Sequence, residues 1–172
     1  MKTALVGAAL VLILVANPVW ACMCPYAQAP VELQVKGELE TSSAVFSGKV
    51  VGYEFRKGLV TELYGPPMTP EEAAEKEVKL VRFKVDRWWK MHLPAEVLLI
   101  TEEWRMPAKE GDMLPRIVSS MCQLPLIEGE SYLIYASGPA DKLRYRTCSR
   151  IATLTKAADD LKVLGKGKRP RK

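Results

Sequence analysis

The chain is poor in the residues from which most hydrolases and metalloenzymes build an active site. It has a single histidine, His92, and a lone histidine makes no zinc site without further ligands. There is no His-Glu-x-x-His pair, no Gly-x-Ser-x-Gly elbow and no phosphate-binding glycine loop. Glu102 and Glu103 are neighbours on a predicted strand, so their carboxylates point to opposite faces and make a poor acid and base pair. We therefore expect a protein that is not an enzyme.

Long apolar runs are also scarce, and the one that is present stands at the N-terminus. The letters ALVGAALVLILVA cover residues 4–16, after a single basic residue at Lys2. This length fits the core of a secretion signal and falls short of the roughly 20 apolar residues that span a bilayer. Pro18 and the small Ala21 follow, which predicts cleavage after Ala21. We expect residues 1–21 to be a signal peptide and the mature protein to be secreted, either extracellular or periplasmic.

The chain has only four cysteines, and all of them follow the predicted cleavage point: Cys22, Cys24, Cys122 and Cys148. An even number of cysteines in an exported chain predicts disulfide bonds. A bond between Cys22 and Cys24 would close a very small, strained ring, so each is expected to pair with one of the two distant cysteines. Both such pairings remain open at this point. Either one closes loops on the order of 100 residues, each stabilising the fold by about 4–5 kcal/mol in the chain-entropy account.

The first cysteine has an alternative interpretation as the lipid-attachment site of a cell-envelope lipoprotein. Val19 and Ala21 fit the pattern of such a site, whereas the bulky Trp20 between them disfavours it. A lipid on Cys22 would block its amine and leave Cys24 as the only N-terminal bridge. A thiol redox site is disfavoured too, because no neighbouring basic residue lowers the thiol pKa.

Beyond the N-terminus the sequence is dominated by alternation with a period of two. In EVKLVRFKVDRWW, residues 77–89, Val81, Phe83 and Trp89 share one face, while Trp88 falls with the charged residues. Similar patterns predict further strands at 44–55, 96–104, 129–137 and 143–151. Five strands in an antiparallel run favour a mainly β fold, built on a small five-stranded barrel.

Two segments carry helical signals instead. TPEEAAEKE, residues 69–77, has Thr69 as a candidate N-cap, and it belongs to an insertion at 56–77 between the first two strands. TKAADDLKVLG, residues 155–165, has Thr155 as a candidate cap and an apolar stripe that we expect to pack on the barrel. Gly165 is a natural stop for this second helix.

The last eight residues, GKGKRPRK at 165–172, carry five basic residues and no acid. We expect them to form a disordered, solubilising tail. The alternative is an electrostatic contact with an anionic polymer of the cell envelope. No internal repeat or linker divides the mature part, so residues 22–164 are expected to form one domain.

The order of these features resembles the netrin-like domain of the tissue inhibitors of metalloproteinases, in the short version found in secreted bacterial proteins. The segments that carry the resemblance are CMCPYA, AVFSGKVVGYE, VRFKVDRWWK, SSMCQLPLIEGESYLIYA and LRYRTCSR, which span residues 22–151. The resemblance implies a barrel of the oligonucleotide/oligosaccharide-binding (OB) type with helices packed beside it. It also implies the disulfide pairs Cys22–Cys122 and Cys24–Cys148.

The resemblance further implies that the mature N-terminus is inhibitory. In the family, the α-amine and carbonyl of the first cysteine, here Cys22, chelate the catalytic zinc of a metalloproteinase. A catalytic zinc keeps an open position that such donors can fill. The side chain of Met23 would then enter the pocket beside the zinc. The implied inhibitory edge consists of Cys22, Met23, Cys24, Pro25, Ser120 and Met121.

The sequence departs from the family at Pro25, which follows Cys24 directly, whereas the family usually has one residue before its proline. Only two bridges are available, and there is no second cysteine-rich domain. The expected partner is a zinc metalloproteinase, with no cofactor of the protein's own and no nucleic acid. The alternative function is a cell-envelope module that binds a glycan or a protein without inhibiting a protease.

Overall fold

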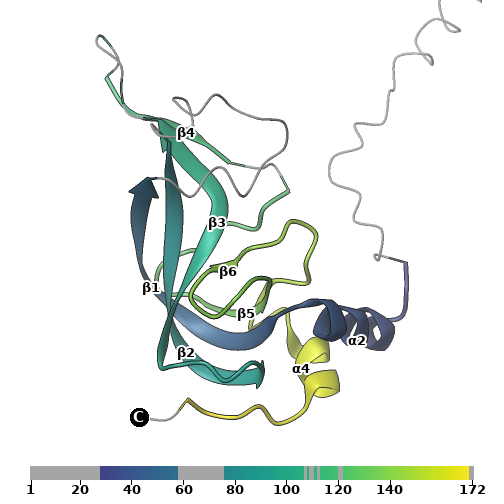
Figure 1. Cartoon of the computed structure of the whole chain (residues 1–172). Helices are drawn as coiled ribbons and strands as arrows, with labels where there is room; N and C mark the ends of the chain where they lie inside the picture. The colour runs from purple at the N-terminus through teal and green to yellow at the C-terminus, as the bar shows by residue number, and fades with distance from the viewer. Residues whose placement is uncertain are drawn as a thin grey trace, which may run out of the picture.

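The computed structural model describes residues 28–57, 76–106, 108, 111, 113–119 and 122–170. Within these ranges the chain forms a curled, largely antiparallel sheet with two helices packed together at one end (Figure 1). The elements are α2 (Val31–Thr41), β1 (Ala44–Lys57), β2 (Glu77–Lys90), β3 (Glu96–Met106), β4 (Arg116–Val118), β5 (Ser131–Ala136), β6 (Leu143–Arg144), β7 (Ala152–Thr153) and α4 (Ala158–Leu164). The expected mainly β fold with one or two helices is confirmed at this level. Neither of the described helices is long and apolar enough to cross a membrane.

The sheet follows the order β4-β3-β2-β1-β5-β7, and β6 pairs with β3 outside this path. Neighbours along the path are antiparallel, whereas β3 and β6 are parallel. Strand β1 organises the sheet, because it pairs with β2 along most of its length and with β5 through Ala44–Lys49. The described sheet has seven strands rather than the expected five. The additional β4 and β7 have three and two residues, which is too short for an alternation signal.

The main hydrophobic core lies inside the curl of the sheet. Phe46, Phe83 and Tyr132 form its centre, with edge-to-face ring contacts at centroid distances of 5.6 and 6.5 Å. Gly48 allows β1 to cross β2 closely, since a Cβ atom there would lie 2.8 Å from the carbonyl oxygen of Lys84. The inward face predicted for Val81 and Phe83 is confirmed.

A second apolar cluster fills the space between the outer face of the sheet and the helices. Its buried members are Val45, Leu133, Tyr135 and Ala157, and the stripe of α4 packs against them. The helix is shorter than expected: it begins at Ala158, and no side chain caps it. The expected stop at Gly165 is confirmed, with a φ of 68°.

The two adjacent tryptophans lie on the faces opposite to those expected. Trp88 packs against the main core, and Trp89 packs against the outer cluster. The cause is a β-bulge: Asp86 is an extra residue between the pairs Gly48↔Val85 and Ser47↔Arg87. One extra residue inverts the alternation of the side chains that follow it, here as far as the next register shift at Trp89.

Helix α2 was not expected from the sequence. Its buried positions are Val35 and Glu38, so its inward face carries an acid instead of a continuous apolar stripe. At its C-terminal end, the ammonium of Lys90 donates to the carbonyls of Leu39 and Glu40 at 2.7 and 2.9 Å. This contact satisfies helix carbonyls that have no partner within the helix and ties α2 to the end of β2.

Three other expectations about the fold need correction. The strand expected at 143–151 ends at Arg144, and the chain then turns. The helix expected at 69–77 lies outside the described residues except for its last two, and Glu77 is the first residue of β2. The tail at 165–172 is not free over its described part, because Lys168 pairs with Trp88 of β2.

Candidate functional site

The whole of the predicted inhibitory edge lies outside the described residues. This applies to Cys22, Met23, Cys24 and Pro25, and also to Ser120 and Met121. The two distant cysteines, Cys122 and Cys148, are described, and both are disulfide-bonded. The site is therefore built up from the surroundings of these two cysteines and from the first described residues of the chain.

The segments that carry Cys122 and Cys148 meet at one end of the curled sheet. The backbone N–H of Leu124 donates to the hydroxyl of Tyr145 at 2.8 Å. Tyr145 is buried in the main core, and its own N–H donates to the carbonyl of Ile100 in β3 at 2.7 Å. Burial raises the pKa of the Tyr145 hydroxyl above its ordinary value, so this buried group stays uncharged. This hydrogen bond lies close to both cysteines, because Cys122 is two residues before Leu124 and Cys148 is three residues after Tyr145.

Cys148 occupies a tight turn in the left-handed backbone region, with a φ of 65°. For a residue other than glycine this conformation costs on the order of 1 kcal/mol, so its surroundings must hold it in place. The carboxylate of Glu102 accepts hydrogen bonds from both the N–H and the hydroxyl of Thr147. The N–H of Ser149 donates to the carbonyl of Arg146 at 3.1 Å and closes the turn. These contacts hold the backbone of the turn that carries Cys148 in one conformation.

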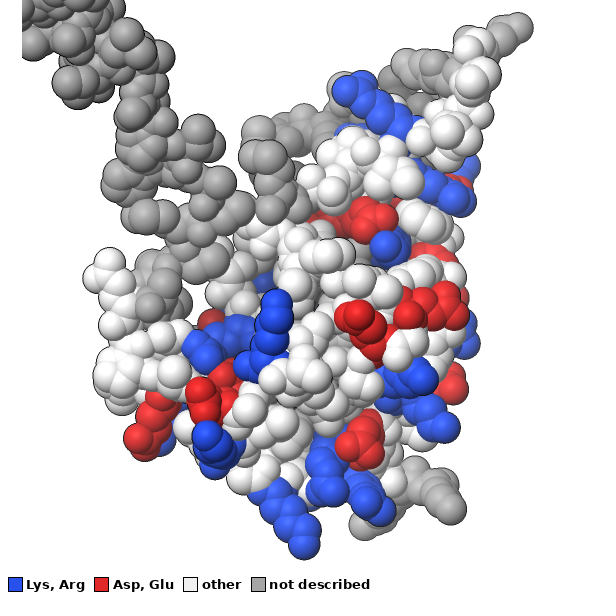
Figure 2. Space-filling model, turned by 180° about the vertical axis from the view of Figure 1, so that it is seen from behind, with Lys and Arg blue, Asp and Glu red and all other residues white. Residues whose placement is uncertain are grey.

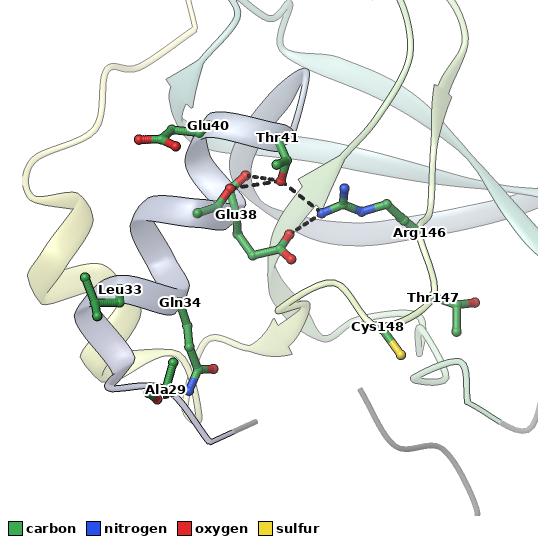
Figure 3. A pocket seen from close by; sticks show the side chains of 10 residues that line it. Ala29, Leu33, Gln34, Glu38, Glu40, Thr41, Arg146, Thr147 and Cys148 are labelled. Carbon is green, nitrogen blue, oxygen red and sulfur yellow. Dashed lines mark hydrogen bonds and ion pairs between the residues drawn. The ribbon is translucent and has the colours of Figure 1, made fainter. Parts of the chain in front are cut away.

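A cavity of about 430 Å³ lies between α2 and this turn (Figure 3). Ala29, at the start of the described chain, lines it together with Cys148. The other lining residues are Leu33, Gln34, Gly37, Glu38, Glu40, Thr41, Arg146 and Thr147. Its volume falls in the range of ordinary ligand pockets. Ala29, near the beginning of the described chain, therefore lies close to the disulfide-bonded Cys148.

An ion pair connects the two walls of this cavity. The guanidinium of Arg146 donates to the carboxylate of Glu38 at 2.6 Å and to the hydroxyl of Thr41 at 3.3 Å (Figure 3). The side chain of Glu38 is only 7% exposed, so it depends on this partner for its charge to be tolerated. The pair therefore holds α2 against the turn that carries Cys148.

A second ion pair, between Arg150 and Asp160, joins the chain after the Cys148 turn to α4. Arg150 donates to both carboxylate oxygens of Asp160 in α4, at 2.9 and 2.5 Å, and also to the side chain of Gln34 in α2. The hydroxyl of Tyr135 in β5 donates to Asp160 at 2.9 Å. Burial, followed by the adjacent Asp160 carboxylate, raises the pKa of Tyr135 well above its ordinary value. The network therefore joins α2, α4 and β5 to the residues that follow the Cys148 turn.

The described residues contain no group of three or more His, Cys, Asp or Glu side chains that could hold a metal ion. The single histidine, His92, is exposed, and its ring contacts the ring of Trp88 edge-on, with centroids 5.4 Å apart. Two carboxylate residues line the cavity near Cys148, Glu38 and Glu40, and the first of them is paired with Arg146. The described ion pairs hold α2 against the turn that carries Cys148 and against α4.

Sequence reasoning missed the ion-paired support entirely. Glu38 and Arg146 are 108 residues apart, and no local pattern connects an acid on one helix to an arginine after a distant strand. The available clue was Pro30 before a stretch without helix breakers other than Gly37. That clue could have indicated α2, but not its partner.

Comparisons with known proteins add no relatives to this picture. No protein-family model matches the chain, and no curated protein matches it. We therefore base the function on the geometry around the cysteines and on the resemblance of the sequence pattern.

Proposed function

We propose that the protein is a secreted inhibitor of zinc metalloproteinases, whose N-terminal Cys22 occupies the catalytic zinc of its target. The observation that carries the proposal is the convergence of Cys122, Cys148 and the beginning of the described chain at one end of the sheet. Ala29 and Cys148 line the same cavity, and the Leu124–Tyr145 hydrogen bond brings the Cys122 segment beside them.

The reach of the chain allows the pairing Cys24–Cys148 and Cys22–Cys122, which is the one that the resemblance implies. Cys24 stands five residues before Ala29, and an extended chain covers at most about 3.6 Å per residue. The Cα atom of Cys24 is thus within roughly 18 Å of that of Ala29, which shares a cavity with Cys148. Two disulfides only two residues apart would leave the terminal residue very little freedom.

Strand connectivity supports the finer proposal that the fold is an OB barrel. Strand β1 pairs with β2 and β5, β2 pairs with β3, and β3 pairs in parallel with β6. An isolated bridge between Ser137, just after β5, and Arg144 in β6 completes the circuit. This circuit of five strands matches a small closed barrel, with β4 and β7 as edge additions.

The chemistry requires only the backbone of Cys22. A free α-amine has an ordinary pKa of about 7.7–8.0, so deprotonating it near neutral pH costs little. The neutral amine and the carbonyl oxygen can fill the position that a catalytic zinc reserves for water, which removes the nucleophile. Because the disulfides order this end in advance, little conformational entropy is lost when the target binds.

The decisive experiment compares three forms of the mature protein. The first begins at Cys22, the second carries one extra alanine before Cys22, and the third carries the extra alanine after Lys172 as a control. We expect the first and third to inhibit a zinc endopeptidase from a panel of secreted enzymes. The second should be at least about 100-fold weaker, since it has lost a chelating group made of two ligand atoms. Equal potency of all three forms would contradict the mechanism.

A further inference from the structure

The described part of the C-terminal segment is docked on the sheet rather than extended into solvent. Trp88 and Lys168 exchange two backbone hydrogen bonds, each of 2.8 Å. The indole N–H of Trp89 donates to the carbonyl of Gly165 at 2.9 Å. The segment covers a part of β2 that lies beyond its pairing with β3, which reaches only as far as Lys84. It therefore completes an edge that would otherwise be unpaired.

Gly167 is the residue that makes this docking sterically possible. A Cβ atom at this position would lie 2.8 Å from a ring carbon of Trp89 and 3.2 Å from the Cβ of Arg87. The guanidinium of Arg87 also donates to the carbonyl of Gly167 at 3.3 Å. The segment thus lies flat against the indole ring, and any side chain here would lift it away.

Docking fixes the backbone of a segment that carries a group of cations. Lys166, Lys168 and Arg169 are all exposed, and none of them makes an ion pair with another described residue. The ammonium of Lys168 lies 5.0 Å from the centre of the Trp88 ring. Residues 161–172 contain no acid at all. Lys and Arg side chains gather along the lower edge of the face shown in Figure 2.

We propose that this basic end, defined as Lys166, Lys168 and Arg169 on their docked segment, binds a linear acidic polysaccharide. A merely solubilising tail gains nothing from a fixed position, whereas a binding site avoids the entropy of ordering its cations. Regularly spaced carboxylates or sulfates along a polysaccharide can meet cations that are held along a strand edge. This activity is separate from the proposed inhibition and does not use Cys22.

The surroundings favour a polysaccharide over a nucleic acid or a membrane. Single-stranded nucleic acids bind through aromatic rings that stack on bases, but the ring of Trp88 is contacted by Lys168 and His92. A membrane surface would require exposed apolar side chains beside the cations. Large exposed apolar residues occur elsewhere among the described residues: Val31, Leu33, Val51, Tyr53, Met113, Leu114, Ile117 and Ile127.

The test uses the full mature protein, with heparin and alginate as the probes. The basic-end variant is K166A/K168A/R169A, and the matched control K36A/K57A/K142A removes three exposed lysines from other parts of the surface. We expect the wild type to bind both polymers at low salt and to elute as NaCl rises. The basic-end variant should bind roughly 10- to 100-fold more weakly, while the control variant stays close to wild type. Equal losses in the two variants would overturn the proposal, because net charge alone would then explain binding.

A third variant tests whether docking matters. Gly167→Val keeps every cation but should displace the segment from Trp89, so we expect several-fold weaker binding, with Gly167→Ala intermediate. Wild-type affinity in both variants would overturn the docked site, as would binding to duplex DNA or anionic vesicles but not to the polysaccharides. The alanine-extended protein should bind the polymers normally, which separates this proposal from the inhibitory one.

Discussion

At the scale of single residues, the support of the site depends on buried charges that are paired. Asp160 accepts hydrogen bonds from Arg150 and Tyr135 and is almost fully buried, with its side chain 6% exposed. Removing one partner of such a pair leaves the other charge uncompensated in a poorly solvated place. Asp160 therefore matters more for the position of the two helices than any exposed ion pair on the surface.

We predict that Asp160→Ala lowers the free energy of unfolding by about 3 kcal/mol, measured by urea denaturation. Asp159→Ala is the matched control, because Asp159 is the adjacent residue on α4 and forms an exposed pair with Lys162. Such a fully exposed pair is screened by solvent and contributes little to stability. Similar small losses in both variants would mean that the Arg150–Asp160 pair does not hold the helices in place.

At the scale of elements, strand β2 shows how one residue sets which faces are buried. Asp86 is an extra residue relative to β1, and its side chain is 66% exposed. Its function in the strand is to shift the alternation, so that Trp88 reaches the main core and Trp89 reaches the outer cluster. The chemistry of the Asp86 side chain is therefore much less important than its presence.

We predict that deleting Asp86 abolishes cooperative unfolding or lowers the melting temperature by at least about 10 °C, because Trp88 and Trp89 would exchange faces. Asp86→Ala keeps the residue count and should melt within about 2 °C of the wild type. Thermal unfolding followed by near-UV circular dichroism detects both effects. A deletion variant with native tryptophan signals would show that the bulge is dispensable.

The same strand shows what can be predicted from the sequence and what cannot. The long alternations at 77–89 and 96–104 were correctly assigned, since period two over many residues leaves few alternatives. The bulge could not be predicted, because it is defined by the register against β1. Helix α2 escaped prediction because its inward Glu38 is neutralised by Arg146, far along the chain.

The candidate site, too, could be predicted from the sequence only in part. The cysteines themselves indicated bridges, and Cys122 and Cys148 are indeed disulfide-bonded. The cavity between α2 and the Cys148 turn could not be predicted, because its walls come from segments more than 100 residues apart. The docked C-terminal segment was also missed, since a run of basic residues looks the same whether it is free or paired.

At the scale of the whole molecule, the described residues form a small curled sheet that carries the two distant cysteines and α2 at one end. The segments of Cys122 and Cys148 are fixed to each other through Leu124 and Tyr145, and α2 is fixed to the same region through Glu38. Everything that we propose about inhibition then depends on one chemical group, the α-amine of Cys22. That amine must be free, and it must be the first group of the mature chain.

Mass spectrometry of the secreted protein, digested without reduction, tests this claim most directly. We predict an unmodified N-terminal peptide that begins at Cys22, with Cys22 linked to Cys122 and Cys24 linked to Cys148. A lipid or other acyl group on Cys22, or a mature chain that begins at another residue, would contradict the account.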